Sequence, residues 1–224
     1  MRRYVATGVV LALLLGTAVA FAETERLKLQ PTPIEESFVQ PAFSPTCACD
    51  QARAEIRVRL HRADSATVRI LDSNGDTVRV LAEDKRLPSG RSRLLWDGRT
   101  EAGARAPDGV YHVDVHLNRP DRTFRLPQSV VLDTVAPTVR VRSYTRNAQL
   151  SQYVRVFYRA SEPAHGILYV DGAKAVGPTY ARRPRAQLQW RAPRPGPYRL
   201  QVAAVDLAGN LGPRTPVFVV RVSP

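Results

Sequence analysis

The chain has 224 residues, enough for one large domain or two small ones, and 44% of them are hydrophobic. Eighteen prolines against thirteen glycines argue against a mainly helical protein, because proline removes a backbone donor and fixes φ. The formal net charge is +13, but no nucleic-acid-binding motif accompanies it, so we expect no nucleic-acid partner.

Residues 1–22 are predicted to form an apolar export segment. Two arginines precede an uncharged run from Val5 to Ala22, and AFA at 20–22 has the small-x-small form of a secretory cleavage site. The run is also long enough to remain as an uncleaved membrane anchor. Both interpretations place the rest of the chain outside the cytoplasmic membrane, secreted or anchored, and membrane contact is expected only through residues 5–22 if they are retained.

Residues 23–43 carry prolines and little periodicity, which indicates a stalk or an extended leader that lies against the first domain. Residues 44–132 then contain short apolar alternations separated by turns, the pattern of an antiparallel sandwich. Between two of these strands, Asn74 and Gly75 supply the positive φ values of a tight hairpin turn.

A second set of alternating strands follows over residues 133–224, after Pro137 interrupts the pattern. We therefore predict an all-β fold of two tandem Ig-like antiparallel β-sandwiches after the N-terminal apolar segment. Arginine alternates with apolar residues in several strands, which is the period of a half-buried strand with one face in solvent. A dedicated site for a polyanion is the alternative interpretation of these arginines.

The two halves repeat one pattern of aromatic residues. Each has a strand that ends in Trp, then a turn with Pro and Gly, then Gly-x-Tyr. Large rings fill the space between two sheets, and a Tyr after a corner can return its hydroxyl to the backbone. We predict core rings, and turn glycines before the tyrosines, in matching pairs: Trp96 with Trp190, Tyr111 with Tyr198, and Gly109 with Gly196.

Catalytic and metal-binding patterns are weak. The chain has no Gly-x-Ser-x-Gly motif and its histidines are scattered, so we expect no enzyme, no cofactor and no metal site. Asp97 and Gly98 are interpreted as turn residues, although Asp97, Glu101 and Asp108 are the candidates for a remote hydrolase role. DSNGD (72–76) and DLAGN (206–210) offer oxygen ligands for calcium, but turns with Asx side chains that cap backbone amides explain them better.

Cys47 and Cys49 are the two cysteines of the chain. In an extended strand their Cα atoms would lie about 6.6–6.8 Å apart, at the outer limit for a disulfide. A turn at Ala48 would shorten this distance, so we predict a small cross-linked loop that opens the first domain. A redox-active pair, free thiols and a bond between chains remain the alternatives.

Residues 66–83 (ATVRILDSNGDTVRVLAE) and 87–115 (LPSGRSRLLWDGRTEAGARAPDGVYHVDV) carry a family resemblance. With FSP at 43–45, the stretch 43–118 resembles the Ig-like domain of FlgD-type flagellar hook-capping proteins. The second domain is similar to bacterial Ig-like modules that begin D-x-x-A-P, here DTVAP (133–137), and end A-x-D-x-A-G-N, here AVDLAGN (204–210).

The resemblance implies Ig-like folds, but hook assembly does not carry over. An export segment and a short leader stand where hook-capping proteins have a further N-terminal region. SPTCACDQ also replaces the Gly- and Asp-rich loop of the family, so no metal is expected in this first turn.

These patterns predict an exported, non-enzymatic structural or interaction module of the envelope or cell surface. Its partner is an unknown protein or an anionic cell-envelope polymer. An arginine-rich binder of an anionic cell-wall or extracellular polymer is the alternative function, and an accessory part of a surface hydrolase is the remote one.

Overall fold

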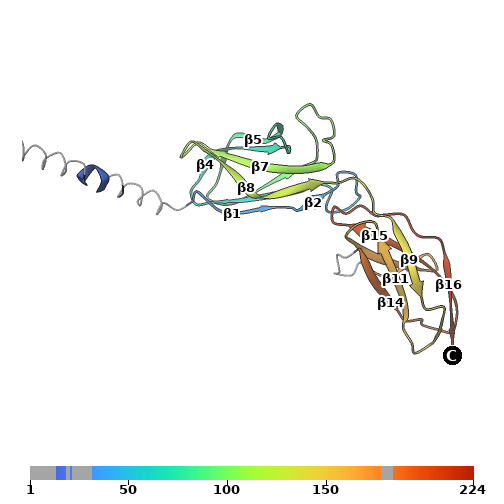
Figure 1. Ribbon diagram of the computed structural model, residues 1–224. Coiled ribbons are helices and arrows are strands. Elements are labelled where there is room, and N and C mark those ends of the chain that lie inside the picture. Colours follow the sequence, from blue (N-terminus) through green and yellow to red (C-terminus); the bar gives the residue numbers. More distant parts are fainter. Residues whose placement is uncertain (1–13, 19–20, 22–31, 178–183) are drawn as a thin grey trace, which may run out of the picture.

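The computed structural model describes residues 14–18, 21, 32–177 and 184–224. Residues 32–177 and 184–224 form two β-sandwiches placed end to end (Figure 1), which confirms the all-β prediction. Most of the expected export segment, residues 1–22, lies outside the described residues, and positions 14–18 and 21 are helical. No helix in the described part of the chain is long and apolar enough to cross a membrane.

The first sandwich has a three-stranded sheet in the order β1-β3-β6 and a five-stranded sheet in the order β2-β8-β7-β4-β5. Neighbouring strands are antiparallel, apart from β2, which runs parallel to β8. The strands are β1 (Ile34–Val39), β2 (Ala42–Phe43), β3 (Ala54–Leu60), β4 (Asp64–Leu71), β5 (Thr77–Leu87), β6 (Gly90–Trp96), β7 (Gly109–Leu117) and β8 (Arg122–Leu132).

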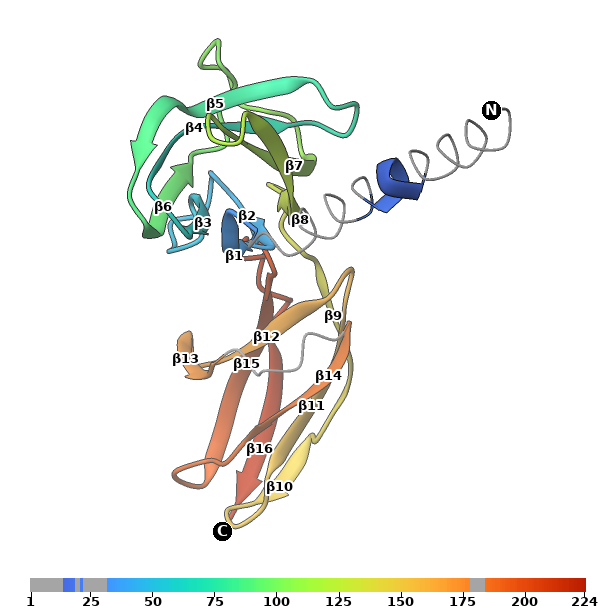
Figure 2. The same ribbon diagram turned by 90° about the vertical axis from the view of Figure 1, so that its left-hand side faces the viewer.

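The second sandwich repeats this topology strand for strand (Figure 2). Its sheets run β9-β11-β14 and β10-β16-β15-β12-β13, and β10 is parallel to β16 as β2 is to β8. The strands are β9 (Val139–Tyr144), β10 (Asn147–Gln149), β11 (Val154–Ala160), β12 (Ala164–Val170), β13 (Ala173–Val176), β14 (Arg185–Trp190), β15 (Gly196–Asp206) and β16 (Phe218–Ser223).

The first sandwich begins earlier than the sequence suggested. β1 pairs with β3, with Val39 opposite Ile56, and β2 pairs with β8. Much of the 23–43 stretch expected as a leader or stalk is therefore part of the sandwich, and residue 44 is too late a boundary. The pattern was hard to recognise because β1 is an edge strand in which Val39 alone is fully buried.

The core of the first sandwich is centred on Trp96, which is fully buried. Its ring lies 5.2 Å from that of Phe43 and 4.8 Å from that of Tyr111, between centroids. The Tyr111 hydroxyl donates a hydrogen bond to the Pro107 carbonyl oxygen at 2.6 Å. Burial raises the pKa of Tyr111, and the nearby Asp charges add to this effect.

The second sandwich keeps the same aromatic pair but buries it less. Trp190 and Tyr198 lie 4.8 Å apart, and the Tyr198 hydroxyl donates to the Arg194 carbonyl oxygen at 2.8 Å. Both side chains are only partly buried. The deepest ring is that of Tyr158, which packs over Gly166 so closely that a Cβ there would overlap it. The principal ring of this core therefore comes from β11.

Candidate functional site at the domain junction

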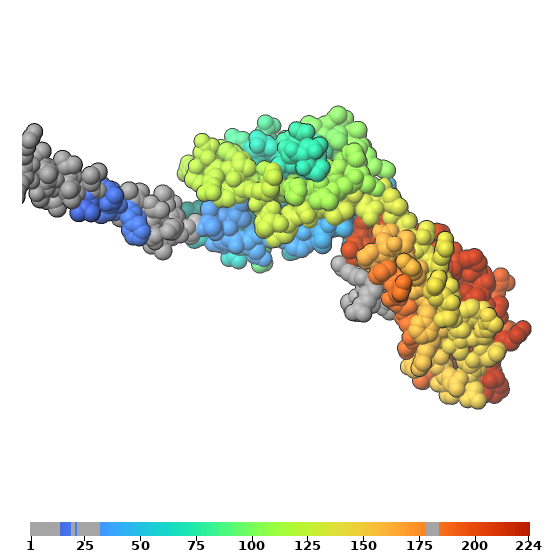
Figure 3. All heavy atoms as spheres, in the orientation of Figure 1, coloured from blue at the N-terminus to red at the C-terminus, as the bar shows by residue number. Residues whose placement is uncertain are grey.

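The two sandwiches meet end to end across residues 133–138 (Figure 3). This linker is held at both of its ends. The Asp133 amide donates to the Phe43 carbonyl oxygen of the first domain at 3.1 Å, and the Ser161 amide of the second domain donates to the Thr138 carbonyl oxygen at 2.9 Å. The short connection therefore continues the hydrogen bonding of both domains.

The turn after β15 is hydrogen-bonded to the linker through Asn210. The Asn210 side-chain amide donates to the Asp133 carbonyl oxygen at 2.9 Å and to Asp206 Oδ2 at 2.8 Å. Asp206 is buried, and its Oδ1 accepts the amides of Ala208 and Asn210. The A-x-D-x-A-G-N motif is thus an Asx-capped turn, and it meets the D-x-x-A-P motif at the junction.

A loop of the first domain also packs on this turn. Gln51 Nε2 donates to the Leu207 carbonyl oxygen at 3.2 Å. Cys47 and Cys49 are joined by a disulfide with Cα atoms 5.3 Å apart, and Cys49 Sγ lies 3.9 Å from the Gly209 carbonyl oxygen. A Cβ on Gly209 would come within 2.6 Å of that sulfur. Residue 209 must therefore be small for the two domains to fit together.

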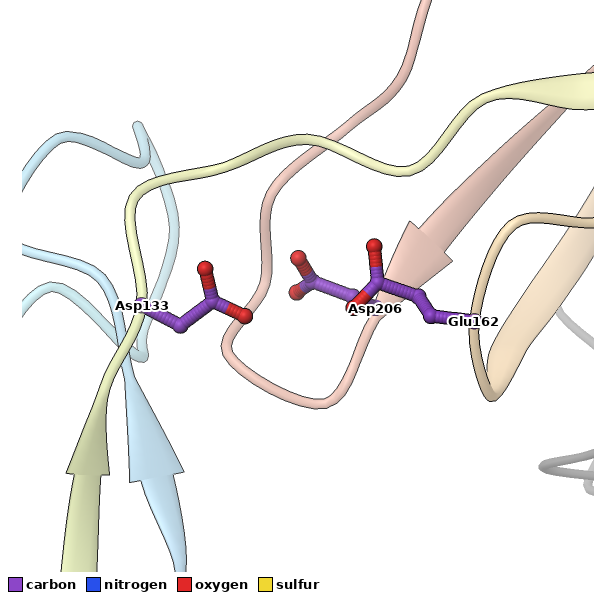
Figure 4. A group of neighbouring side chains, drawn as sticks. All are labelled: Asp133, Glu162 and Asp206. Atoms are coloured by element: carbon purple, nitrogen blue, oxygen red, sulfur yellow. The ribbon is translucent and has the colours of Figure 1, made fainter. Parts of the chain in front are cut away.

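Three carboxylates meet beside this contact (Figure 4). Asp133 comes from the linker, Glu162 from the loop between β11 and β12, and Asp206 from the end of β15. One oxygen of each lies within 4.8 Å of the others, and the described residues contain no second such group of three. Burial raises the pKa of Glu162, and the charges of Asp133 and Asp206 raise it further.

These three carboxylates are the residues of the described chain best placed to hold a hard cation, which prefers oxygen ligands. Both oxygens of Asp206 already accept hydrogen bonds from amides. The sequence pointed to Asp206 through its DLAGN turn but not to Asp133 or Glu162 as its neighbours. Glu162 stands in a loop with no recognisable motif, so only the fold brings it to the group.

The carboxylates considered for a remote hydrolase role do not form such a group. Each accepts a backbone hydrogen bond at a different place: Asp97 from Arg99 at 3.1 Å, Glu101 from Val80 at 3.0 Å, and Asp108 from Thr134 at 3.0 Å. Asp108 also accepts the hydroxyl of Thr134, so it helps to fix the linker. Within the described residues their visible role is to cap turns and loops.

Of the turn residues singled out in the sequence, Gly75, Gly98 and Gly196 have a positive φ, whereas Asn74, expected to supply one, does not, and Gly109 is the first residue of β7 without one. Gly75 has φ +92° in the hairpin between β4 and β5, where Asp72 Oδ1 accepts the amides of Asn74 and Asp76. Gly98 has φ +75°, and a Cβ there would lie 3.0 Å from the Pro45 side chain. The turn after Trp96 therefore packs against the loop that carries the two cysteines.

Comparison with known families identifies the first domain. Residues 44–121 match the model of the FlgD Ig-like domain. The first sandwich is therefore similar to the FlgD Ig-like domain over this stretch, and β1 and β2, which precede it, complete its sheets. None of the curated proteins compared with the chain matches it.

Several solved structures share a limited likeness with the chain. The fibronectin(III)-like modules of Clostridium thermocellum CbhA share 15% identity at a TM-score of 0.45, over 84% of this chain and 94% of theirs. A C-terminal intimin fragment, solved with the intimin-binding domain of its translocated receptor, shares 10% sequence identity at a TM-score of 0.41. The match covers 85% of this chain and 64% of the intimin fragment. A BSP domain of a biofilm-associated protein shares 12% sequence identity at a TM-score of 0.31. That match covers 86% of this chain and 30% of the biofilm-associated protein.

Proposed function

We propose that the chain is an exported, non-enzymatic structural or interaction module whose two Ig-like domains act as one elongated unit. The observation that carries this proposal is the junction. The linker is hydrogen-bonded to both domains, and the loop that contains Cys49 fits against Gly209. A flexible tether between independent domains would need none of these contacts.

A fixed junction gives the outward faces of the two sandwiches a defined orientation. Binding by such domains is commonly carried by loops and faces on a rigid scaffold. The duplicated topology also supports a structural role, because both copies preserve the sheet order and the Trp-Tyr contact. The module therefore presents surfaces rather than enclosing a reaction.

Two further features support export and a non-enzymatic role. The sequence opens with an uncharged run, Val5 to Ala22, preceded by arginines. The acids considered for hydrolysis, Asp97, Glu101 and Asp108, cap backbone amides at separate places. Placed apart in this way, the three acids do not assemble the nucleophile, base and oxyanion donors that acyl or glycosyl transfer requires.

Fractionation of native cells tests this function. We expect to recover the protein from the membrane or the medium. Its intact mass should correspond to a chain that starts either at Glu23 or at Met1. A mass two daltons below the all-thiol value would also support the Cys47–Cys49 disulfide in the native protein. Recovery of the full-length chain from the cytoplasm alone would overturn the proposal.

A further inference from the structure

The outward face of β9, β11 and β14 is strongly basic. Alternate residues of these strands point to solvent, and the arginines among them are all exposed. The three strands contain no Asp or Glu. We call this surface the arginine face and define it by Arg140, Arg142, Arg155, Arg159 and Arg185.

These arginines lie close together, and in the described part of the chain they have no partners of opposite charge. Arg159 on β11 stands directly opposite Arg140 on β9 and Arg185 on β14. Like charges in directly opposed positions destabilise a sheet. Within the described residues, none of the five guanidinium groups forms an ion pair. The fold itself therefore gains nothing from this arrangement of charge.

The equivalent face of the first domain shows the contrast. The outward arginines of β3 and β6 are paired with glutamates of β1 and β3: Arg59 with Glu35 at 2.8 Å, Arg93 with Glu55 at 3.0 Å, Arg91 with Glu36 at 3.3 Å and Arg57 with Glu55 at 3.6 Å. The same position in the fold can thus carry arginines that are neutralised. In the second domain the neutralising acids are missing.

The charge of the whole second domain follows the same trend. Residues 133–224 contain fourteen Lys and Arg against four Asp and Glu, a formal charge of +10 out of the total of +13. Three of these four acids form the cluster at the junction: Asp133, Glu162 and Asp206. The fourth, Asp171, accepts the Arg199 amide in the turn between β12 and β13. The arginine face is therefore left without compensation by the domain's own acids.

An exposed aromatic ring lies among these arginines. Phe157 on β11 is 43% exposed. It borders a shallow depression of about 440 Å³ together with Arg142, Arg159, Arg185 and Gln187. An apolar ring surrounded by guanidinium groups can contact a ligand that is itself both apolar and anionic.

We propose that the arginine face binds an acidic polysaccharide through its repeated carboxylates. A guanidinium group makes two parallel hydrogen bonds to a carboxylate, and the ring of Phe157 packs on the apolar side of a sugar. Outward positions on one sheet face recur about every 6.6–6.8 Å along a strand and about every 4.8 Å across strands. Arg140 and Arg142 are one such step apart, and Arg155 and Arg159 are two steps apart with Phe157 between them. A linear polymer laid over the face can therefore meet several of them at once.

The number of aromatic rings favours this ligand over single-stranded nucleic acid. Platforms for single strands stack successive bases on several aromatic side chains. Within β9, β11 and β14, Phe157 is the one large exposed ring, and Tyr153, which precedes β11, already has the Arg191 guanidinium over its ring at 4.3 Å. The face therefore offers no row of free rings on which successive bases could stack. The proposal gives the interaction role of the module a partner class, and it rests on that role but not on export.

Calorimetric titration of the full chain with oligogalacturonate tests the proposal. The Arg142→Gln/Arg159→Gln variant should lose about tenfold or more in affinity. The matched control, Arg199→Gln/Arg221→Gln, removes the same charge from exposed positions of β15 and β16 and should lose less than about threefold. Phe157→Ala should weaken binding while leaving the salt dependence unchanged, because it removes no charge.

Other outcomes would overturn the proposal. Equal losses in both double variants would mean that net charge alone attracts the polymer. Tighter binding of an oligothymidylate, or equal binding of methyl-esterified oligogalacturonate, would exclude recognition of a carboxylated glycan. Thermal melting of each variant shows whether it is folded. The interaction role itself would survive a negative result, because it is argued from the fixed junction, which the scattering of the Gly209→Ala variant tests separately.

Discussion

The two sandwiches have the same strand order but differ in how they use the positions outside the core. In the first, Glu35, Glu36 and Glu55 neutralise the arginines of the three-stranded sheet. In the second, the equivalent sheet has no acid. Two sheets with the same strand order therefore differ in surface charge, because the buried alternation sets the fold and leaves the outward residues free to vary.

The cores differ as well. Trp96 is fully buried in the first sandwich, but Trp190 is only partly buried in the second, where Tyr158 is the deepest ring. The second domain therefore preserves the Trp-Tyr contact while it relies on another ring for most of its core.

Removal of the two tryptophans should affect the domains unequally. We expect Trp96→Ala to lower the free energy of unfolding of the first domain by about 3–5 kcal/mol, because a large buried ring leaves a cavity. Trp190→Ala should cost the second domain about 2 kcal/mol, because less of its side chain is buried. Calorimetric unfolding measures both values, and equal losses would contradict the difference in burial.

The two Asx-capped turns should also differ. Asp206→Ala should destabilise the second domain by about 1–3 kcal/mol, because it leaves the buried amides of Ala208 and Asn210 without an acceptor. Asp72→Ala removes a similar cap in the exposed hairpin of the first domain. It should cost about 0.5–1 kcal/mol, since water can replace the lost acceptor. Urea unfolding of both variants checks the order, and a larger loss in Asp72→Ala would reverse it.

The junction can be tested at Gly209. Gly209→Ala should cost about 1 kcal/mol for the positive φ and also shift the domains, because the new Cβ would meet Cys49 Sγ. Gly172→Ala is the matched control, with φ +83° and no atom within 4 Å of its Cβ. Small-angle scattering should change for Gly209→Ala alone. Unchanged scattering in both variants would show that the cysteine loop does not set the domain arrangement.

The smallest effect concerns the acid cluster. The pKa of Glu162 is raised in the folded protein, so the folded state binds this proton more tightly than the unfolded chain. The protonated Glu162 carboxyl therefore contributes to folding stability below the pKa that it has in the unfolded chain. This contribution is lost as the pH rises through the pKa that it has in the folded protein. Glu162→Gln should raise the free energy of unfolding at pH 7 by less than about 1 kcal/mol.

Unfolding curves measured from acid to neutral pH check this sign. The loss of stability with rising pH should be smaller in Glu162→Gln than in the unaltered protein. A variant that is less stable than the parent at neutral pH would show that the Glu162 carboxylate is favourable at the junction.

The sequence was most informative about the interior. Alternation and turn residues predicted the all-β class, and the residues of 43–118 carried the FlgD-type resemblance that the match over 44–121 confirms. The sequence did not indicate β1 as a strand, because an edge strand buries few of its side chains. Tyr158 was also missed as the main ring of the second core, although it alternates with Val154 and Val156 in YVRVFYRA.

The surface features depended on the fold. Asp133, Glu162 and Asp206 are distant in sequence and meet only when the linker and two loops converge. Alternating arginines occur in both domains, and their pattern alone does not show which of them have partners. The sheet order places Glu35 and Glu36 of β1 beside the arginines of β3 and β6. In the second domain β9 has the position of β1, and it carries Arg140 and Arg142 where β1 carries Glu35 and Glu36.

The most direct test of this account is amide chemical-shift mapping of the isotope-labelled full chain during addition of oligogalacturonate. We expect the shifts to concentrate on β9, β11 and β14, around Phe157 and Arg159, and to be small on β1, β3 and β6. Shifts of equal size on the two three-stranded sheets, or shifts confined to the first domain, would contradict the claim that unpaired arginines make the second domain the binding surface.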